Sequence, residues 1–301
     1  MSAQLGIDLG GTKIEGIVLD NQGKTLWQQR IKTPQGDYQA TLTALINLII
    51  QAETALQLTL PIGLGLPGSL SPTTGLMRNA NSTCLNGQAL KKDLESQLKR
   101  SINISNDANC FVLSEATDGA AKGAKSVFGV IIGTGTGAGM VFNGQLLNGQ
   151  NGIAGEWGHN PLPWASAEEN QQNLCWCGQK SCIETWLSGP ALEKSYFKQS
   201  HLTKTATQIV KAAETGDIIA EQILIDYESR MARSLAHIIN IFDPEIIVLG
   251  GGLSNISRLY QNIPPLWSKW VFSDQVTTQL VAPLYGDASG VRGACWLAGQ
   301  S

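Results

Sequence analysis

"GIDLGGTKIEGIVLD", residues 6–20, is an apolar run, a turn of glycines and threonine, and a second apolar run rich in β-branched residues. This pattern predicts a strand, a tight turn and a second strand. The stretch "SVFGVIIGTGTGAGMVF", residues 126–142, repeats the plan later in the chain. We therefore interpret the chain as two rounds of one strand–turn–strand unit, which is its most informative organisational feature.

The segments around these two units alternate between strand and helix patterns. Apolar residues at helical spacing predict helices over 37–56 and 90–100, and further helices are expected near 184–199, 205–215 and 217–241. Buried strands are expected to enter the glycines after 61 and before 250. We predict an α/β chain with an N-terminal domain at 1–118 and a larger domain at 119–288. A C-terminal helix, 289–301, is expected to pack back on the first domain.

Composition limits the class of protein. The chain has 301 residues, of which 43% are hydrophobic and 15% charged, and 21 basic against 24 acidic residues give a net charge of −3. This is an ordinary globular composition of a length that suits two domains. No basic block suggests nucleic acid, and no apolar run reaches membrane-spanning length. We read no secretion signal at the N-terminus and expect a cytoplasmic protein with reduced thiols.

Three glycine-rich turns follow predicted strands: "DLGGTK" at 8–13, "GTGTG" at 133–137 and "GGG" at 250–252. None fits the P-loop or the dinucleotide fingerprint. Their glycines nevertheless let backbone N–H groups form anion-binding concavities, and threonines in the first two add hydroxyl donors. Lys13 adds positive charge, and Asp8 would suit a hydrated Mg²⁺ beside a phosphate. The plain alternative is a set of tight hairpin turns.

"CWCGQKSC", residues 175–182, brings three cysteines into eight residues. Three thiols cannot all pair among themselves, and the spacing is not that of a Cys-x-x-Cys redox motif. A metal site needs another ligand, and His159, at the end of "GEWGH", is the most suitable of the three histidines. We predict zinc bound by His159, Cys175, Cys177 and Cys182. The alternative is three unconnected thiols in a turn.

Several motifs, in order along nearly the whole chain, resemble those of the ROK family of sugar kinases. They are "GIDLGGTKIEGIVLD", "NDAN", "IIGTGTGAG", "GEWGHNPLP", "CWCGQKSCIE" and "VLGGGLSN". "NANSTCLNGQ" and "EWGHNPLPW" are most similar to its bacterial fructokinase branch, which includes enzymes that also take mannose. The resemblance implies a duplicated actin-like ATPase (ribonuclease H-like) fold, with two domains flanking a cleft, and commonly a homodimer.

The activity that the resemblance implies is ATP-dependent phosphorylation of a hexose at its 6-hydroxyl. D-Fructose is the expected substrate, and mannose, glucose and N-acetylglucosamine are the alternatives. Asp107, in "NDAN", would be the general base. The residues expected around the sugar are Gly68, Asn81, Asn106, Asp107, Glu156, His159 and Glu184. The residues expected to bind Mg-ATP are Asp8, Gly10, Gly11, Thr12, Lys13, Gly133, Thr134, Gly135, Thr136, Gly137, Gly250, Gly251 and Gly252.

Zinc would be structural and would hold the loop that carries the sugar-binding residues. Two positions depart from the family pattern: Ser181 stands where glycine is usual, and Cys84 stands where related fructokinases often carry tryptophan. Most tryptophans of the chain are interpreted as packing residues. Two other classes remain as alternatives: a sugar-responsive regulator and a non-catalytic sugar-binding protein. We see no room for a DNA-binding domain before Asp8, and Asp107 with both turns favours the kinase.

Overall fold

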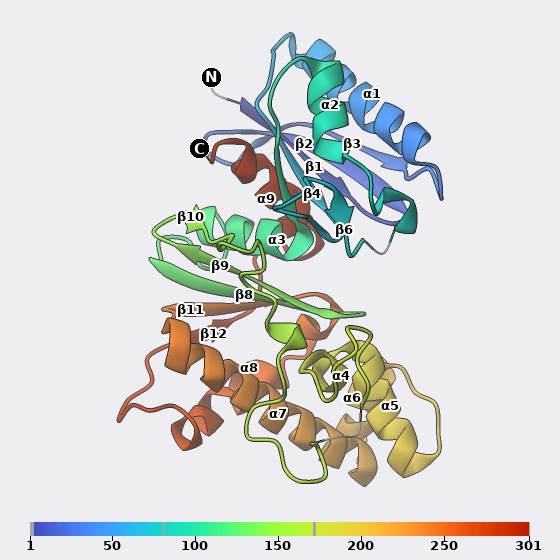
Figure 1. Ribbon diagram of the computed structural model, residues 1–301. Helices are drawn as coiled ribbons and strands as arrows, with labels where there is room; N and C mark the ends of the chain where they lie inside the picture. The colour runs from blue at the N-terminus through green and yellow to red at the C-terminus, as the bar shows by residue number, and fades with distance from the viewer. Residues whose placement is uncertain (1–2, 81, 171–172, 301) are drawn as a thin grey trace. The chain divides into compact units, whose positions relative to one another are not determined.

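The structure is a computed structural model that describes residues 3–80, 82–170 and 173–300 (Figure 1). The chain divides into two compact units. The first consists of residues 1–123, 139–154 and 284–301, and the second of residues 124–138 and 155–283. Helices and strands alternate through both units, which confirms the α/β class predicted from the sequence.

The first sheet has five strands in the order β3-β2-β1-β4-β7, and its three parallel strands β1, β4 and β7 lie side by side. Its strands are β1 (Ala3–Leu9), β2 (Lys13–Asp20), β3 (Thr25–Lys32), β4 (Ile62–Leu66) and β7 (Asn103–Asn106). β1, β2 and β3 pair antiparallel, whereas β4 pairs parallel with β1 and β7 parallel with β4. In this register Asp8 lies opposite Gly65, and Leu66 lies opposite Asn106. The carboxyl ends of β1, β4 and β7 therefore meet at one edge of the sheet.

Helices cover both faces of the first sheet. They are α1 (Tyr38–Leu56), α2 (Leu90–Leu98), α3 (Asp107–Thr117) and α9 (Ser289–Ala298). α1 packs on the face to which Gly16 points, where a Cβ would lie 3.1 Å from Leu48. α9 packs on the opposite face, so closely that a Cβ at position 63 would lie 1.9 Å from the carbonyl oxygen of Ala294. Only glycine at position 63 allows this approach.

After β4 the chain forms a short antiparallel pair and a short helix before it reaches α2. These elements are β5 (Ser69–Leu70), β6 (Met77–Arg78) and the 3₁₀ helix η1 (Thr83–Leu85). Leu85 is buried in the core that β1, β4 and α1 form. The segment 82–85 is therefore anchored next to the end of β1.

The second sheet repeats the connections of the first, in the order β10-β9-β8-β11-β12. Its strands are β8 (Ser126–Ile132), β9 (Thr136–Phe142), β10 (Gln145–Leu146), β11 (Ile246–Gly250) and β12 (Gln279–Val281). As in the first sheet, the opening strand β8 lies beside the next strand of the chain, β9, and pairs parallel with a later one, β11. The internal repeat predicted from the two glycine-rich stretches is thus confirmed by two sheets of equivalent strand order.

In the second unit, α4 to α7 follow the predicted helical segments with one division, whereas α8 was not predicted. The α-helices of this unit are α4 (Glu184–Leu187), α5 (Gly189–Ser200), α6 (Ala206–Glu214), α7 (Ile218–Phe242) and α8 (Arg258–Asn262). Its 3₁₀ helices are η2 (Trp157–His159), η3 (Gly252–Asn255) and η4 (Pro264–Lys269). A further 3₁₀ helix, η5 (Gly286–Ala288), belongs to the first unit. The predicted helix 184–199 divides at Ser188. Its side chain accepts a hydrogen bond from Ala191 N at 3.3 Å and so starts α5, with Pro190 in the first turn.

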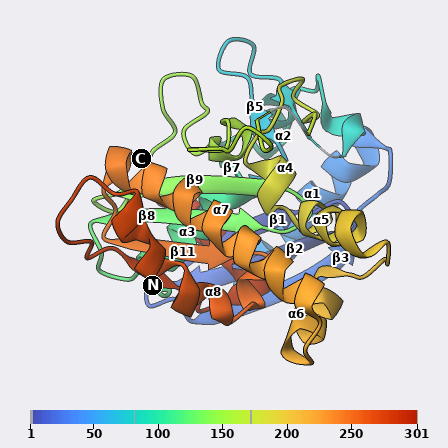
Figure 2. The same cartoon turned by 90° about the horizontal axis from the view of Figure 1, so that it is seen from below.

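α7 crosses β8 and β11 of the second sheet (Figures 1 and 2). It has 25 residues, the length of a membrane span, but its polar face carries ion pairs. Arg258 donates to Glu221 and Glu228, and Arg233 donates to Glu169. Among the described residues, no helix combines the length and apolarity that crossing a bilayer requires.

Candidate active site

The first glycine turn is held in the first unit by the residues that follow β3. Thr33 Oγ1 donates to the carbonyl of Gly10 at 2.7 Å, and Gln35 Nε2 donates to that of Gly11 at 2.7 Å. Thr33 N donates to the carbonyl of Thr12 at 3.1 Å. The turn's carbonyls are thus occupied, and among the described residues the N–H groups of Gly11 and Thr12 have no partner. Such N–H groups suit an anion.

Asp8 and Asp107 lie near one another at the carboxyl edge of the first sheet. Burial, followed by the negative charge of Asp107, raises the pKa of the Asp8 carboxyl from 3.8 to about 6, although Lys13 opposes this. Asp107 is exposed at the first position of α3, and the preceding Asn106 side chain caps the helix by accepting from Asn109 N at 2.8 Å. This cap fixes the backbone at Asp107 and therefore the position from which its side chain extends.

Lys13 forms a long ion pair with the carboxylate of Glu15. Its Nζ lies 3.9 Å from Glu15, which is buried and also forms a 2.7 Å ion pair with Arg30. The side chain of Lys13 is half-exposed, so its ammonium group can still turn toward an anion above the glycine turn.

A cavity of about 400 Å³ lies beside the first turn. Its lining consists of Leu9, Gly11, Thr12, Thr33, Pro34, Gln35, Gly36, Thr41, Ser82, Thr83, Cys84 and Leu85. Gly68 lies in the turn after β4 with φ of 83°, and a Cβ there would lie 2.4 Å from the carbonyl oxygen of Arg78. Position 68 therefore requires glycine. Asn81, predicted to bind the sugar, is outside the described residues.

The second glycine turn, between β8 and β9, is held by residues of α4 and α5. Thr136 N donates to Glu184 Oε2 at 2.9 Å, and Gly189 N donates to the carbonyl of Gly133 at 2.8 Å. A Cβ at Gly135 would lie 2.8 Å from Glu184 Oε2. Because Thr136 N–H binds Glu184 and Gly133 N–H binds the carbonyl of Gly135, not every N–H of this turn is available to a phosphate.

The remaining N–H groups of the second turn are those of Thr134 and Gly135. Neither has a protein partner within the ranges that the structure describes. The third turn, at the end of β11, lies beside this one: Gly250 pairs with Ile131, and a Cβ at Gly251 would lie 2.5 Å from the carbonyl oxygen of Ile132. Gly251 has φ of 78°, so the close approach of the two turns depends on glycine.

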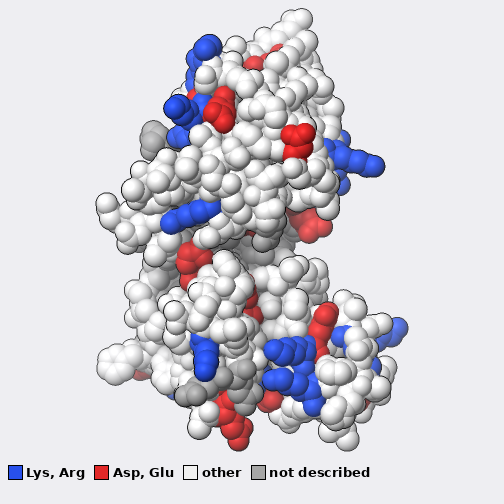
Figure 3. All heavy atoms as spheres, turned by 45° about the vertical axis from the view of Figure 1, so that its right-hand side comes forward, with Lys and Arg blue, Asp and Glu red and all other residues white. Residues whose placement is uncertain are grey.

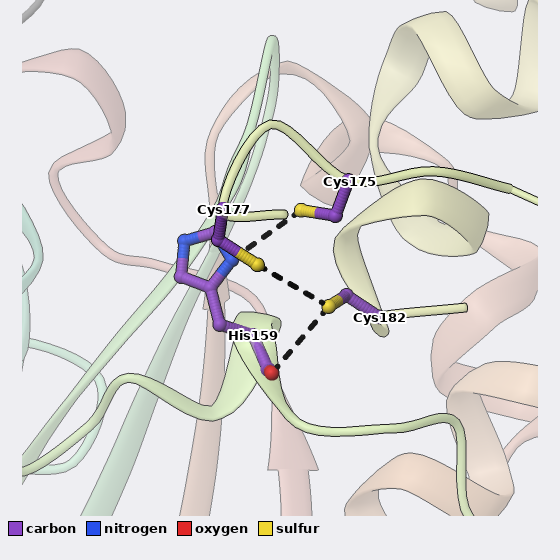
Figure 4. Close-up of side chains that lie close together, drawn as sticks. All are labelled: His159, Cys175, Cys177 and Cys182. Carbon is purple, nitrogen blue, oxygen red and sulfur yellow. Dashed lines mark hydrogen bonds between the residues drawn. The ribbon is translucent and has the colours of Figure 1, made fainter. Parts of the chain in front are cut away.

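His159, Cys175, Cys177 and Cys182 form a group that could hold a metal ion (Figure 4). Their ligand atoms lie within 4.8 Å of one another. Cys175 Sγ lies 3.6 Å from His159 Nδ1, and Cys177 Sγ lies 3.7 Å from Cys182 Sγ. All six cysteines of the chain are among the described residues and are free thiols.

The loop between His159 and Cys175 is anchored to α7 through Glu169. Arg230 donates to Glu169 at 2.8 Å and Arg233 at 2.9 Å, while Ser166 N donates at 3.0 Å. Although burial raises the pKa of Glu169, these hydrogen bonds lower it to about 2. Ser181, which has φ of 56°, donates its hydroxyl to the carbonyl of Glu169 at 2.7 Å. This bond compensates for a backbone conformation that favours glycine.

Of the predicted sugar-binding residues in the second unit, Glu156 precedes η2, His159 is the last residue of η2, and Glu184 begins α4. Sequence reasoning missed Trp176, which was grouped with the packing tryptophans. The structure leaves it 68% exposed, with its indole N–H donated to Glu184 Oε1 at 2.8 Å. Its place between two cysteines of the motif is the only sequence signal that could have singled it out.

Comparison with known proteins identifies the class. The N-acetyl-D-glucosamine kinase of Photobacterium profundum is 38% identical over 296 residues, which cover 97% of this chain and 98% of that protein. The corresponding kinase of Pectobacterium carotovorum subsp. carotovorum is 36% identical over 296 residues, 97% of each chain. The ROK hexokinase of Thermus thermophilus has 28% identity and a TM-score of 0.87, covering 98% of this chain and 97% of that one.

A ROK family glucokinase of Streptomyces griseus, solved in complex with glucose and AMPPNP, shares the fold with a TM-score of 0.77 at 24% identity and full coverage of both chains. Fold and relatives together define a sugar kinase of the actin-like ATPase fold. The chain belongs to the ROK family, whose model matches residues 4–301. The family predicted from the sequence motifs is thereby confirmed.

Proposed function

We propose that the chain transfers the γ-phosphoryl group of ATP to the 6-hydroxyl of N-acetyl-D-glucosamine. The observation that carries this proposal is the identity of 36–38% to N-acetyl-D-glucosamine kinases over 97% of the chain. Fructose, the substrate first expected, has less support, because these relatives are by name N-acetyl-D-glucosamine kinases, a hexokinase and a glucokinase. The comparisons therefore favour one of the alternatives left open by the sequence.

The cavity beside the first turn is compatible with this substrate. Its lining combines apolar side chains, such as Leu9 and Leu85, with the hydroxyls of Thr33, Ser82 and Thr83. An acetamido group has the same character, since it joins an apolar methyl to a polar amide. A small residue, Cys84, lines the cavity where a large one would reduce its volume. We assign this cavity to the acetamido substituent.

Asp107 is proposed as the general base. Its exposed carboxylate would accept the proton of the 6-hydroxyl as the hydroxyl oxygen attacks the γ-phosphorus and ADP leaves. Asn106, which caps α3, keeps the backbone of Asp107 in place. Phosphoryl transfer needs little covalent participation from the protein, so orientation of the hydroxyl is the main contribution of these residues.

The glycine turns are proposed to bind the nucleotide phosphates. The available N–H groups are those of Gly11 and Thr12 in the first unit and of Thr134 and Gly135 in the second. Magnesium bound with the nucleotide would screen the phosphate charge, and Asp8 is the residue that would hold its water shell. With a pKa of about 6, Asp8 is mostly ionised at neutral pH, which fits a hard cation.

The four metal-ligand residues fit a structural zinc ion. Zinc binds sulfur at about 2.3 Å and nitrogen at about 2.0 Å, so tetrahedral ligands lie about 3.8 Å apart for two sulfurs and about 3.5 Å for sulfur and nitrogen. Two of the separations match these values, 3.7 Å for Cys177 Sγ to Cys182 Sγ and 3.6 Å for Cys175 Sγ to His159 Nδ1, and all ligand atoms lie within 4.8 Å of one another. Four protein ligands leave no open position, so we propose that the ion stabilises the loop that carries His159 and Glu184 toward the sugar.

The family resemblance also supports a homodimer without nucleic-acid partners. On the face shown in Figure 3, basic side chains occur singly or in small groups next to acidic ones, rather than as a broad basic surface. Sedimentation velocity would test the dimer, with a species near the 32.2 kDa of one chain as the contrary result.

The test of the function is ADP release with Mg-ATP and each of N-acetyl-D-glucosamine, glucose, mannose and fructose. We expect the highest kcat/KM for N-acetyl-D-glucosamine and a loss of about 10²–10⁴-fold in kcat for Asp107→Asn. Asp287→Asn, which changes an exposed carboxylate of η5, is the matched control and should retain full activity. A preference for fructose would overturn the substrate, and an active Asp107→Asn variant would overturn the base.

A further inference from the structure

Glu184 receives hydrogen bonds from two separate parts of the second unit. Its Oε1 accepts from the indole N–H of Trp176, and its Oε2 accepts from the backbone N–H of Thr136. We propose that Trp176 is a positioning residue that orients Glu184 and thereby links the metal-ligand loop to the sugar and to the second glycine turn. This inference rests on the proposed function, in which Glu184 binds the sugar.

The surroundings of Trp176 indicate that packing is not its main role. It lies between Cys175 and Cys177, and 68% of its surface is exposed. Its ring packs edge-on against His159, with centroids 4.9 Å apart and planes at 89°. A large apolar side chain this exposed gains little from burial. Its specific contacts, with the ring of His159 and the carboxylate of Glu184, account for its position.

The opposite side of Glu184 is equally restricted. Oε2 lies 2.9 Å from Thr136 N, and a side chain at Gly135 would collide with it at 2.8 Å. Hydrogen bonds to a carboxylate are stronger than those between neutral groups, and two of them from opposite sides select one rotamer. Each oxygen keeps a second acceptor direction, so the oriented carboxylate can still accept a sugar hydroxyl.

Through this chain of contacts, the loop that carries Cys175, Trp176 and Cys177 would affect the binding of both the sugar and ATP. A bound metal would fix the backbone on either side of Trp176 through Cys175 and Cys177. Trp176 fixes one oxygen of Glu184, and the other oxygen accepts from the N–H of Thr136. Without the indole N–H, Glu184 can rotate away, and both the sugar-binding geometry and the conformation of the turn are affected. The metal cluster itself would remain, because none of its ligand atoms changes.

Trp176→Phe tests this directly, since it removes the N–H donor and retains an aromatic ring against His159. Trp164→Phe is the matched control: Trp164 is also exposed, but it packs against His237 and Trp270 and does not contact Glu184. We expect KM for the sugar to rise about tenfold in Trp176→Phe, equivalent to about 1.4 kcal/mol. KM for ATP should rise less, and bound metal per chain should equal that of the wild type.

Amide hydrogen exchange at Thr136 provides a readout that needs no turnover. Because Thr136 N–H is bound by Glu184, we expect about tenfold faster exchange there in Trp176→Phe and no change in Trp164→Phe. Adding Trp176→Phe to Glu184→Gln should have little further effect on sugar affinity, since the two residues act as a unit.

The outcomes separate the two proposals. Exchange at Thr136 that is equal in Trp176→Phe and the control overturns the positioning role, and so does loss of metal from Trp176→Phe. A wild-type protein that phosphorylates no hexose overturns the proposed function, while the exchange measurement still decides whether Trp176 orients Glu184.

Discussion

Asp8 is a carboxylate at a position where negative charge is unfavourable in the folded chain. Burial and the nearby charge of Asp107 raise its pKa from 3.8 to about 6. We predict that Asp8→Asn, which removes the charge and retains the shape of the side chain, stabilises the protein in the absence of Mg-ATP. The same change should lower activity, because the variant loses the carboxylate proposed to hold the magnesium water shell.

The magnitude follows from the pKa. A rise from 3.8 to about 6 corresponds to about 3 kcal/mol, since each pKa unit is worth about 1.4 kcal/mol. Asp8 is partly accessible to water, so screening reduces the expected gain in the free energy of unfolding to about 1–2 kcal/mol. Because the folded-state pKa is the higher one, the cost of Asp8 is absent below about pH 4 and grows as the pH rises to about 6.

Urea unfolding followed by far-UV circular dichroism, at pH 7.5 and at pH 4.5 without nucleotide, measures this difference. We expect the free energy of unfolding of Asp8→Asn to exceed that of the wild type at pH 7.5. At pH 4.5 this difference should fall to about a third of its value at pH 7.5. Asp287→Asn, an exposed carboxylate of the same unit, should show no gap at either pH. An Asp8→Asn variant no more stable than the wild type at pH 7.5 would refute the reasoning.

Three further changes test the metal site, the cavity and the loop. Cys177→Ser removes an exposed thiolate ligand without opening a core cavity, so metal analysis should show loss of one ion per chain and a lower Tm; a variant that keeps its metal contradicts the site. Cys84→Trp should fill the cavity beside the first turn and lower kcat/KM for N-acetyl-D-glucosamine at least about tenfold, with a smaller effect on glucose; equal losses for both sugars would count against the acetamido assignment. Ser181→Gly loses the hydrogen bond to the carbonyl of Glu169 but relieves a left-handed backbone, and these terms, each about 1 kcal/mol, should nearly cancel in thermal unfolding with the metal retained. A destabilisation of more than about 2 kcal/mol would show that the hydrogen bond dominates.

Most secondary structure could be predicted because its signals are local. The apolar spacing of 37–56 predicted a helix that the structure bounds at Tyr38 and Leu56, and the repeat of two glycine-rich stretches predicted two equivalent sheets. The division at Ser188 was missed, because a serine before glycine and proline can cap a new helix only if the chain changes direction there. Apolar periodicity does not record that change.

The candidate site likewise combines features that the sequence predicts with features that only the folded structure shows. Residue types and spacing alone determined which side chains could ligate a metal and which turns could approach a phosphate, since both depend on short sequence motifs. Tertiary structure alone decided that Glu184 occupies the N–H of Thr136, that Trp176 holds the other oxygen of Glu184, and that Asp107 raises the pKa of Asp8. Hydrogen bonding and electrostatic repulsion depend on separations of a few ångströms between residues far apart in the chain, and only the folded arrangement of strands and loops sets those separations.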